Sequence, residues 1–243
     1  MISAAFNFLL YNPLYNALIF FISVAPYASA GIAVILLTVV VKLVLFPLSL
    51  KAVKTQVLMR ELEPELTKIK KQYEKDKQEQ ARRTMVLYKE KGVNPFSGFL
   101  VILIQLPIIF ALYFVFFRGG LPTIDPALLY SFVTPPSRVN MEFLWVPDIA
   151  GRSVVLALLV SVTQYFQINL TMPPLKPRDK NASLKDDLAR SFQLQMRYVM
   201  PLIVFGVAYF ISAAIALYWT TSNLFAIAQE VFVLKKHRGP KKT

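Results

Sequence analysis

Apolar residues gather in four long blocks along the chain, and charged segments separate the blocks. A helix needs about 20 mainly apolar residues to cross the hydrocarbon core of a bilayer, so each block is long enough for a crossing. The last block is too long for one crossing and predicts two helices with a tight turn near residues 212–214. The pattern therefore predicts five membrane-spanning helices from four blocks: Ile32–Leu50, Phe99–Phe117, Val154–Met172 and Tyr198–Leu234.

The segment before the first block is also apolar, but Asn7, Asn12, Pro13 and Asn16 interrupt it. It has no basic n-region and no clear cleavage site of small residues, so it does not resemble a cleaved signal peptide. We predict an amphipathic helix at about residues 13–24 that lies in the outer membrane interface. A sixth spanning helix is the alternative.

The polar segment between the first two blocks has a helical pattern. Apolar residues recur there at spacings of three and four, which places them on one face of a helix: Leu58, Leu62, Leu66, Ile69 and Tyr73. A shorter matching stripe follows: Ala81, Met85 and Tyr88. The polar run 74–80 predicts a turn between them, and Pro64 is expected to start or kink the first arm. We predict a helical hairpin; a disordered basic linker is the alternative.

Charge is distributed unevenly and indicates the orientation. The net charge is +13, residues 1–30 contain no Lys or Arg, and residues 50–95 contain twelve. Residues 172–197 contain six more, and the tail from Lys235 contains five. Basic loops stay in the cytoplasm, so the hairpin, the 172–197 loop and the C-terminus are predicted inside. The N-terminus and the 118–152 loop are predicted outside.

Composition excludes several classes of chemistry. The chain of 243 residues is 56% hydrophobic, which is typical of a polytopic membrane protein. It has no cysteine, and its single histidine, His237, lies in the polar tail. Disulfides, thiolate metal sites, a cysteine nucleophile and histidine-based triads are therefore excluded or disfavoured. There is also no glycine-rich phosphate loop, so we predict no catalytic residues, no metal and no cofactor.

Lys42 lies inside the first apolar block. An ammonium near mid-membrane costs roughly 2.5–3.5 kcal/mol on insertion scales, and such residues are functional candidates by default. Lys42 lies about eight residues from the end of its run, or about 12 Å at 1.5 Å per residue, which is far from the headgroups. We interpret it as facing water within the membrane; snorkelling or a buried pair is the alternative.

Other polar residues of the spans gather at the same depth. With the predicted orientation, they occupy the cytoplasmic half of four helices, and such groups face a bundle interior or a water-filled cavity. We predict a cavity open to the cytoplasm and closed outside by apolar packing; hydrogen bonding between helices is the simpler alternative. The candidate residues are Thr38, Lys42, Gln105, Gln164, Gln167, Trp219 and Asn223.

A positively charged cavity closed on one side suits a hydrophilic, often acidic, peptide segment that is carried part-way into the bilayer. The core lacks the carboxylates and histidines of proton relays, and the chain lacks the inverted repeat of secondary transporters. A small channel or solute transporter and a scaffold without insertion activity remain as alternatives. The basic tail suits a ribosome or RNA surface, or anionic lipids, equally well: Lys235, Lys236, Arg238, Lys241 and Lys242.

At these residues the chain resembles the YidC family of membrane protein insertases. The resemblance covers residues 13–235 and rests on a series of motifs in order: PLYNAL, VVVKLVLFPLSLKAVKTQ, LEPELTKIKKQY, MVLYKEKGVNPFSGFLVILIQLPIIFALYFVF, TQYFQ and ALYWTTSNLFAIAQ. The family implies five spans, an outer interfacial helix, a cytoplasmic hairpin that receives clients and a hydrophilic groove with one basic residue. Implied partners are nascent membrane proteins with short translocated tails, the ribosome, the Sec translocon and anionic lipids, but no DNA.

The chain departs from the family pattern at two places. The groove residue is usually arginine, and the matching position is Lys42, which keeps the charge but loses the planar fork of donors. Relatives often carry Pro and Gly before the ALYW motif, where this chain has Ser212, Ala213 and Ala214, so a softer or shifted helix break is expected. The chain resembles the compact bacterial form, without a large external domain or a transit peptide.

Together these arguments predict an all-α polytopic protein of the bacterial plasma membrane, with the N-terminus outside. The expected order is an interfacial helix (1–27), a first span (28–50), the cytoplasmic hairpin (51–95), a second span (96–117) and an external loop (118–152). A third span (153–172), a cytoplasmic loop (173–196), a fourth span (197–212), a fifth span (213–234) and a basic tail (235–243) complete it.

Overall fold

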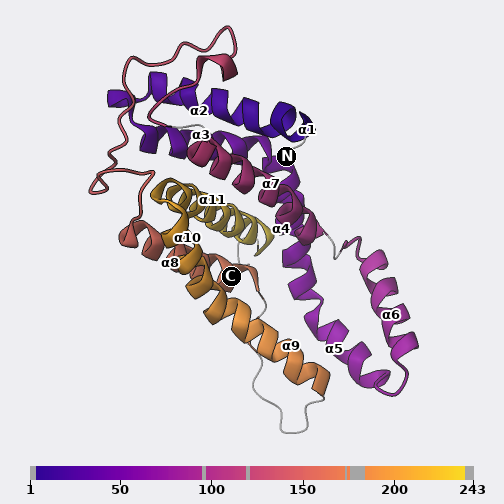
Figure 1. Ribbon diagram of the computed structural model, residues 1–243. Coiled ribbons are helices and arrows are strands. Elements are labelled where there is room, and N and C mark those ends of the chain that lie inside the picture. Colours follow the sequence, from indigo (N-terminus) through magenta and orange to yellow (C-terminus); the bar gives the residue numbers. More distant parts are fainter. Residues whose placement is uncertain (1–3, 95–96, 119–120, 173, 176–183, 239–243) are drawn as a thin grey trace. The chain divides into compact units, whose positions relative to one another are not determined.

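The computed structural model describes residues 4–94, 97–118, 121–172, 174–175 and 184–238 (Figure 1). These residues are folded almost entirely into helices joined by short connections and one long loop, as the sequence predicted. Extended structure among them is limited to two isolated bridges, Ser29 with Asn140 and Phe143 with Val146.

The chain divides into two compact units. The first comprises residues Met1–Val44 and Gln105–Ala228, and the second comprises Leu45–Ile104 and Gln229–Thr243. Two helices contribute to both units: α7 (Ser97–Arg118) and α11 (Ala213–Arg238). The other described α-helices of the first unit are α1 (Ala4–Phe6), α2 (Asn12–Val24), α3 (Ala30–Val44), α8 (Val154–Thr171), α9 (Leu184–Leu194) and α10 (Met200–Ile211).

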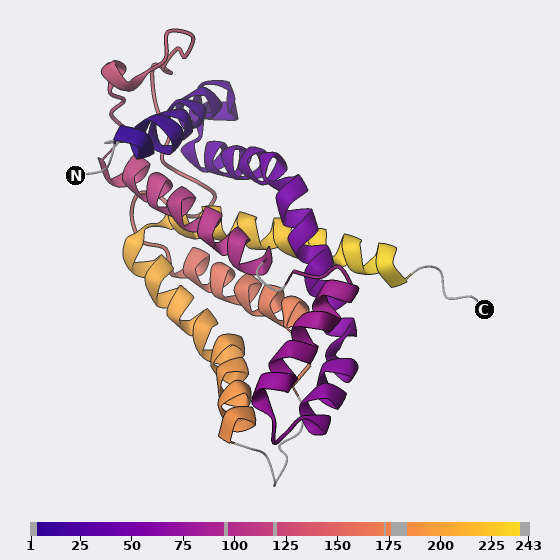
Figure 2. The same ribbon diagram turned by 90° about the vertical axis from the view of Figure 1, so that its right-hand side faces the viewer.

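Helices α2 and α3 pack side by side, as Figures 1 and 2 both show. The buried face of α2 repeats at spacings of three and four: Tyr15, Leu18, Ile19 and Ile22. Two side chains of α2 also hold the long loop between α7 and α8. The buried Asn16 donates from Nδ2 to Leu128 O at 2.8 Å and accepts at Oδ1 from Tyr130 N at 2.7 Å. The Tyr15 hydroxyl accepts from Asp125 N at 3.0 Å, so the loop is fastened to α2 at several points.

Helices α8 and α10 form the second close pair of this unit (Figure 2). Small residues, Ala157 on α8 and Ala208 on α10, are fully buried and allow the backbones to approach. Ser161 Oγ donates to Pro201 O at 2.8 Å across the pair. Close packing and the bond between Ser161 and Pro201 therefore hold this pair together.

The long apolar block 198–234 is divided at a single extended residue, Ser212. The absence of Pro and Gly suggested a softer helix break, but the structure has a sharp break at Ser212. Ser212 Oγ accepts from Ile215 N at 3.3 Å, as a helix N-cap does. The two preceding N–H groups donate to loop carbonyls, Ala213 N to Gly151 O and Ala214 N to Ile149 O, both at 2.7 Å. The first N–H groups of α11 thus have partners without a Pro-Gly turn.

The second unit contains α4 (Phe46–Glu61), α5 (Glu63–Gln72) and α6 (Lys77–Glu90). The first apolar block was expected to be one continuous span to Leu50, but α3 ends at Val44 and α4 begins at Phe46. Pro47 lies in the first turn of α4 and explains the break, because it has no N–H to donate to the carbonyl four residues earlier. Pro64 likewise lies in the first turn of α5, as predicted.

The polar segment forms the predicted helical hairpin, with α5 and α6 as its arms (Figures 1 and 2). Its apolar cluster consists of Leu62, Leu66, Leu87 and Val93, with Leu58, Met59, Ile69 and Tyr88 packed against it. Four of the five residues of the first predicted stripe pack in this cluster, and Tyr73 is not part of it. The stripe predicted for the second arm is wrong in two of its three positions, because Ala81 and Met85 are exposed and only Tyr88 packs, next to Leu87. Gly92, with a φ of 64°, ends α6 and returns the chain so that Val93 joins the cluster.

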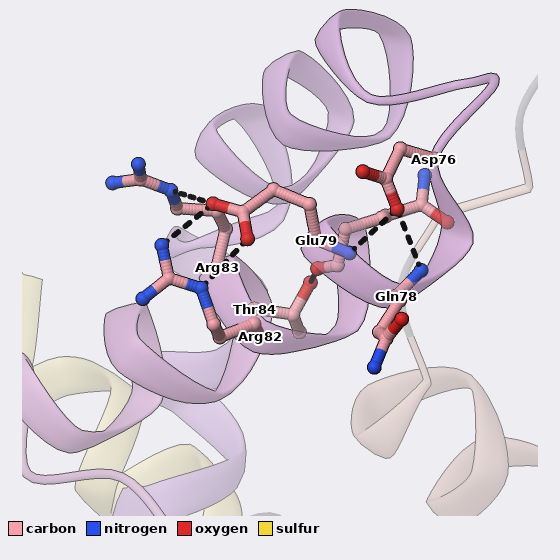
Figure 3. Close-up of polar contacts among 7 residues, drawn as sticks. Asp76, Gln78, Glu79, Arg82, Arg83 and Thr84 are labelled. Carbon is pink, nitrogen blue, oxygen red and sulfur yellow. Dashed lines mark hydrogen bonds and ion pairs between the residues drawn. The ribbon is translucent and has the colours of Figure 1, made fainter.

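Polar contacts define the hairpin tip (Figure 3). The Asp76 carboxylate accepts from Gln78 N and Glu79 N and caps α6, so the turn is shorter than the predicted 74–80. Glu79 accepts charge-assisted hydrogen bonds from Arg82 Nε at 2.6 Å and Arg83 Nε at 2.8 Å. These bonds, first of all that from Arg82, lower the pKa of Glu79 to about 2. Glu79 therefore stays ionised at physiological pH, and the tip has no acid switch there.

Three described helical runs are long and apolar enough to cross a membrane: Ala4–Val24, Val154–Thr171 and Arg190–Ile211. The pair α3–α4 would make a fourth if the two bent helices form one span. Leu106–Phe116 is a shorter apolar helix within α7. The interfacial position of residues 1–27 and the count of five spans stay predictions.

Candidate functional site

The C-terminal half of α8 carries a ladder of polar side chains on one face. Gln164 Nε2 donates to Gln167 Oε1 at 3.2 Å, and Gln167 Nε2 donates to Thr171 Oγ1 at 3.1 Å. The spacings of three and four residues place these side chains in one row along the helix. Thr171 Oγ1 in turn donates to the backbone carbonyl of Gln167, which closes the row within α8.

Asn223 extends the ladder from α8 to α11. Its Nδ2 donates to Thr163 Oγ1 and to Gln164 Oε1, both at 3.2 Å. Asn223 is 6% exposed and Thr163 is 8% exposed, so this junction lies inside the first unit. Thr163 also donates to Leu159 O within its own helix. The row from Asn223 through Gln164 and Gln167 to Thr171 is therefore continuous. Gln164 and Gln167 each accept and donate within it, an arrangement that strengthens successive bonds.

The ladder uses only part of its hydrogen-bonding capacity. A primary amide has two N–H donors and an oxygen with two lone pairs, and Gln164 and Gln167 are only half-buried. Nearby on α11, the Thr220 hydroxyl is buried and has no hydrogen-bond partner in the described part of the chain. The face can therefore accept further polar groups, which interhelical bonding alone would not require.

The predicted residues of α3 lie one turn apart on one face. Thr38 is fully buried and donates to Val34 O at 2.6 Å, so its hydroxyl is satisfied within the helix. Lys42 is half-buried and lies in the last turn of α3, which ends two residues later at Val44. The sequence argument placed Lys42 about eight residues from the end of a continuous helix, and the break at Leu45 corrects it. The carbonyl end of a helix attracts cations by about 0.3–1 kcal/mol, so the break provides a favourable place for this charge.

The remaining predicted residues are distributed as follows. Trp219 is half-buried on α11, and the side chain of Gln105 on α7 lies outside the described part. On the hairpin, Tyr73 faces Arg83, whose guanidinium carbon lies 5.8 Å from the ring centroid. Lys235 is exposed on α11; Lys236 and Arg238 belong to α11 but their side chains are not described, and Lys241 and Lys242 lie outside the described residues.

Three members of the site were not among the sequence candidates: Thr163, Thr171 and Thr220. Thr171 ends the ladder on α8, whereas Thr163 and Thr220 lie beside Gln164 and Trp219 in the sequence. Both are buried hydroxyls next to predicted site residues. The signal for Thr163 is its position, since 163, 167 and 171 follow one another at intervals of four residues.

Comparison with known proteins places the chain in a family. Residues 21–241 match the family described as 60Kd inner membrane protein. The chain is 34% identical over 219 residues to the membrane protein insertase YidC of Clostridium tetani, covering 89% of this chain and 88% of the relative. It is 33% identical to the membrane protein insertase YidC of Fusobacterium nucleatum, covering 93% of this chain and 98% of the relative.

A solved structure shares the fold. The crystal structure of an active YidC insertase with its first transmembrane domain resolved matches with a TM-score of 0.60 at 23% identity, over 93% of this chain and 46% of that chain. The sequence matches extend over nearly the whole length of both relatives, and the fold agrees with them. The chain therefore belongs to the YidC family of membrane protein insertases and is an integral inner membrane protein.

Proposed function

We propose that this protein accepts hydrophilic segments of client proteins on the polar face of α8, α11 and α3 and releases their apolar helices into the bilayer. The observation that carries the proposal is the half-buried ladder of Gln164 and Gln167, joined to the buried Asn223. Amides that faced lipid without partners would cost several kcal/mol each, whereas a water-filled groove would satisfy them. Assistance with client folding belongs to the same proposal.

The groove is proposed to open to the cytoplasm and to hold Lys42 as its positive charge. Support comes from the basic loops, which favour a cytoplasmic position for the hairpin and for the C-terminus. Clients would be nascent membrane proteins with short translocated tails, and a tail with acidic residues would be attracted to Lys42. Binding energy from groove and charge together would lower the barrier to moving a short hydrophilic tail part-way into the membrane.

Cysteine labelling tests the groove directly, because the chain contains no native cysteine. We expect Gln164→Cys and Gln167→Cys to react with a water-soluble maleimide added from the cytoplasmic side. Phe166→Cys is the matched control: Phe166 has nearly the same depth on α8 and is 56% exposed, on a face that we assign to lipid. It should not react. Equal protection at all three positions, while Gln78→Cys in the hairpin reacts, would indicate a dry face and contradict the proposal.

The hairpin is proposed to receive or guide clients before they reach the groove. Its exposed tip and the basic tail would contact arriving chains, the ribosome, the Sec translocon or anionic lipids. Met85, exposed on the second arm, offers a flexible apolar side chain for such contacts.

Shortening the hairpin is expected to slow insertion without unfolding the core. Replacing residues 70–83 with a short linker removes the tip but keeps the four cluster residues Leu62, Leu66, Leu87 and Val93. The measurement is the insertion rate of a single-span client into proteoliposomes. The control carries the same linker inserted at the tip after Glu74, with nothing deleted. If the shortened protein inserts clients as fast as the control, the receiving role is wrong.

A further inference from the structure

The loop between α7 and α8 ends in a segment that is hydrogen-bonded to the ends of two helices, α3 and α11. We call residues 140–151 the strap. Asn140 exchanges hydrogen bonds with the start of α3, donating to Ala28 O at 3.0 Å and accepting from Ala30 N at 2.9 Å. At its other end, the carbonyls of Ile149 and Gly151 accept from the first N–H groups of α11. Figure 1 shows this rose-coloured segment passing the corner between α2 and α3. These hydrogen bonds therefore hold the strap at the ends of α3 and α11.

The middle of the strap is a tight turn with an apolar tip. Phe143 and Val146 exchange two backbone hydrogen bonds, each 2.9 Å, and leave Leu144 and Trp145 as the two turn residues. Val146 is buried beneath the turn, but Leu144 is 71% and Trp145 is 56% exposed. The tip thus presents two large apolar side chains that the chain itself does not cover.

Backbone strain accompanies this exposure. Leu144 has a φ of +53°, in the left-handed region that glycine or asparagine normally occupies. The other described non-glycine residues with positive φ are Tyr27 and Ala28, at the corner that Asn140 holds. Tyr27 is 90% exposed. Strained positions that carry exposed apolar side chains gain nothing from internal packing, so their side chains point to an external contact.

We propose that the strap tip, Leu144 and Trp145, inserts into the headgroup region of the bilayer and anchors this end of the helix bundle. Trp is enriched at membrane interfaces because its apolar ring contacts lipid while its N–H donates to water or headgroups. The strap is tied to the ends of α3 and α11, so its tip lies at the level where an interface belongs. Glu142 and Asp148, both exposed, flank the tip with polar groups.

A second copy of the chain is a less suitable occupant than lipid. A stable protein interface buries roughly 1,200–2,000 Å² in total. One aromatic side chain contributes at most about 150–250 Å², so two side chains at a narrow turn fall well short. A bilayer requires no complementary surface, and it accepts a tip of this size.

Environment-sensitive probes test the anchor. NBD attached to Leu144→Cys or Trp145→Cys, in full-length protein reconstituted in phosphatidylcholine vesicles, should show blue-shifted emission. Phosphatidylcholine with a shallow nitroxide should quench it. The same probe at Ser137→Cys, an exposed loop position outside the strap, should emit as in water and resist the lipid quencher. Emission at the tip equal to that at Ser137 would overturn the proposal. Shielding that the lipid nitroxide does not quench, and that rises with protein density, would assign the tip to a second copy and also overturn it.

A glycine substitution separates the anchor from a role in folding. Leu144→Gly removes the side chain and relieves the positive φ, so the thermal stability of the protein in detergent should be unchanged or higher. Lipid quenching of a probe at position 145 should fall in the same variant. If stability drops while the quenching at position 145 is unchanged, Leu144 is a packing residue and the anchor is wrong.

Discussion

Replacing Lys42 with alanine is expected to slow the insertion of clients with acidic tails about tenfold, and Lys42→Glu is expected to fail with them. Two unit charges at 4 Å attract by about 4 kcal/mol at an effective dielectric of about 20. Desolvation of both groups opposes much of this attraction. We therefore expect a net effect of about 1.4 kcal/mol, which corresponds to a factor of ten. Lys42→Arg keeps the charge and should remain active.

The measurement uses a client series that differs only in the charge of its translocated tail. Charge attraction predicts a defect of Lys42→Ala that grows with the negative charge of the tail. The rival explanation is that Lys42 only keeps the groove hydrated, in which case Lys42→Gln serves every client as well as the native residue does. Equal defects of Lys42→Ala across the series would favour hydration. Full activity of every variant would remove Lys42 from the mechanism.

The spacing of apolar residues predicted which face of a single helix is buried. The stripe Leu58, Leu62, Leu66 and Ile69 packs as its spacing required, because a helix repeats every 3.6 residues whatever its partner is. The second arm was misjudged because Met85 and Leu87 are both apolar and point in different directions. Only the partner helix decides which of the two is covered, and a single arm does not contain that information.

Helix ends and loops were harder to predict than helix faces. Pro47 could have indicated the break at Leu45. Because the apolar run continues through the break, hydropathy alone predicts a single span. Asn16 appeared only to interrupt an apolar stretch, whereas it fastens a loop more than a hundred residues away. The strap has no periodic pattern, and its hydrogen bonds to α3 and α11 depend on tertiary structure.

Three of the seven groove candidates lie together in the structure, but the sequence did not predict their mutual geometry. Depth along each span brought Gln164, Gln167 and Asn223 together, and hydrogen bonds join all three. Their order in the ladder depends on the rotation of α8 relative to α11, which spacing within one helix does not determine. The same limit applies to Thr163, whose role as acceptor for Asn223 requires both helices.

Gly31→Ala is expected to destabilise the protein by about 1–3 kcal/mol, the usual cost of overpacking a filled site. A Cβ at Gly31 would collide with Cδ2 and Cγ of Phe143 and would lie 2.7 Å from its Cβ. Phe143 cannot withdraw freely, because its backbone is hydrogen-bonded to Val146 in the strap. Helix propensity alone favours alanine over glycine by up to about 1 kcal/mol, so the two effects have opposite signs. We expect the collision to be larger.

Two controls isolate the collision, with thermal unfolding in detergent as the measurement. Gly206→Ala on α10 meets no atom within 4 Å, so propensity acts there alone and the variant should be as stable as the native protein or more stable. In a Phe143→Gly background all three colliding atoms are gone, and Gly31→Ala should become neutral or stabilising. The sign should therefore reverse between the two backgrounds. A loss of the same size in both would show that Gly31 is required for the backbone of α3 itself, and that the contact between α3 and the strap does not set the cost.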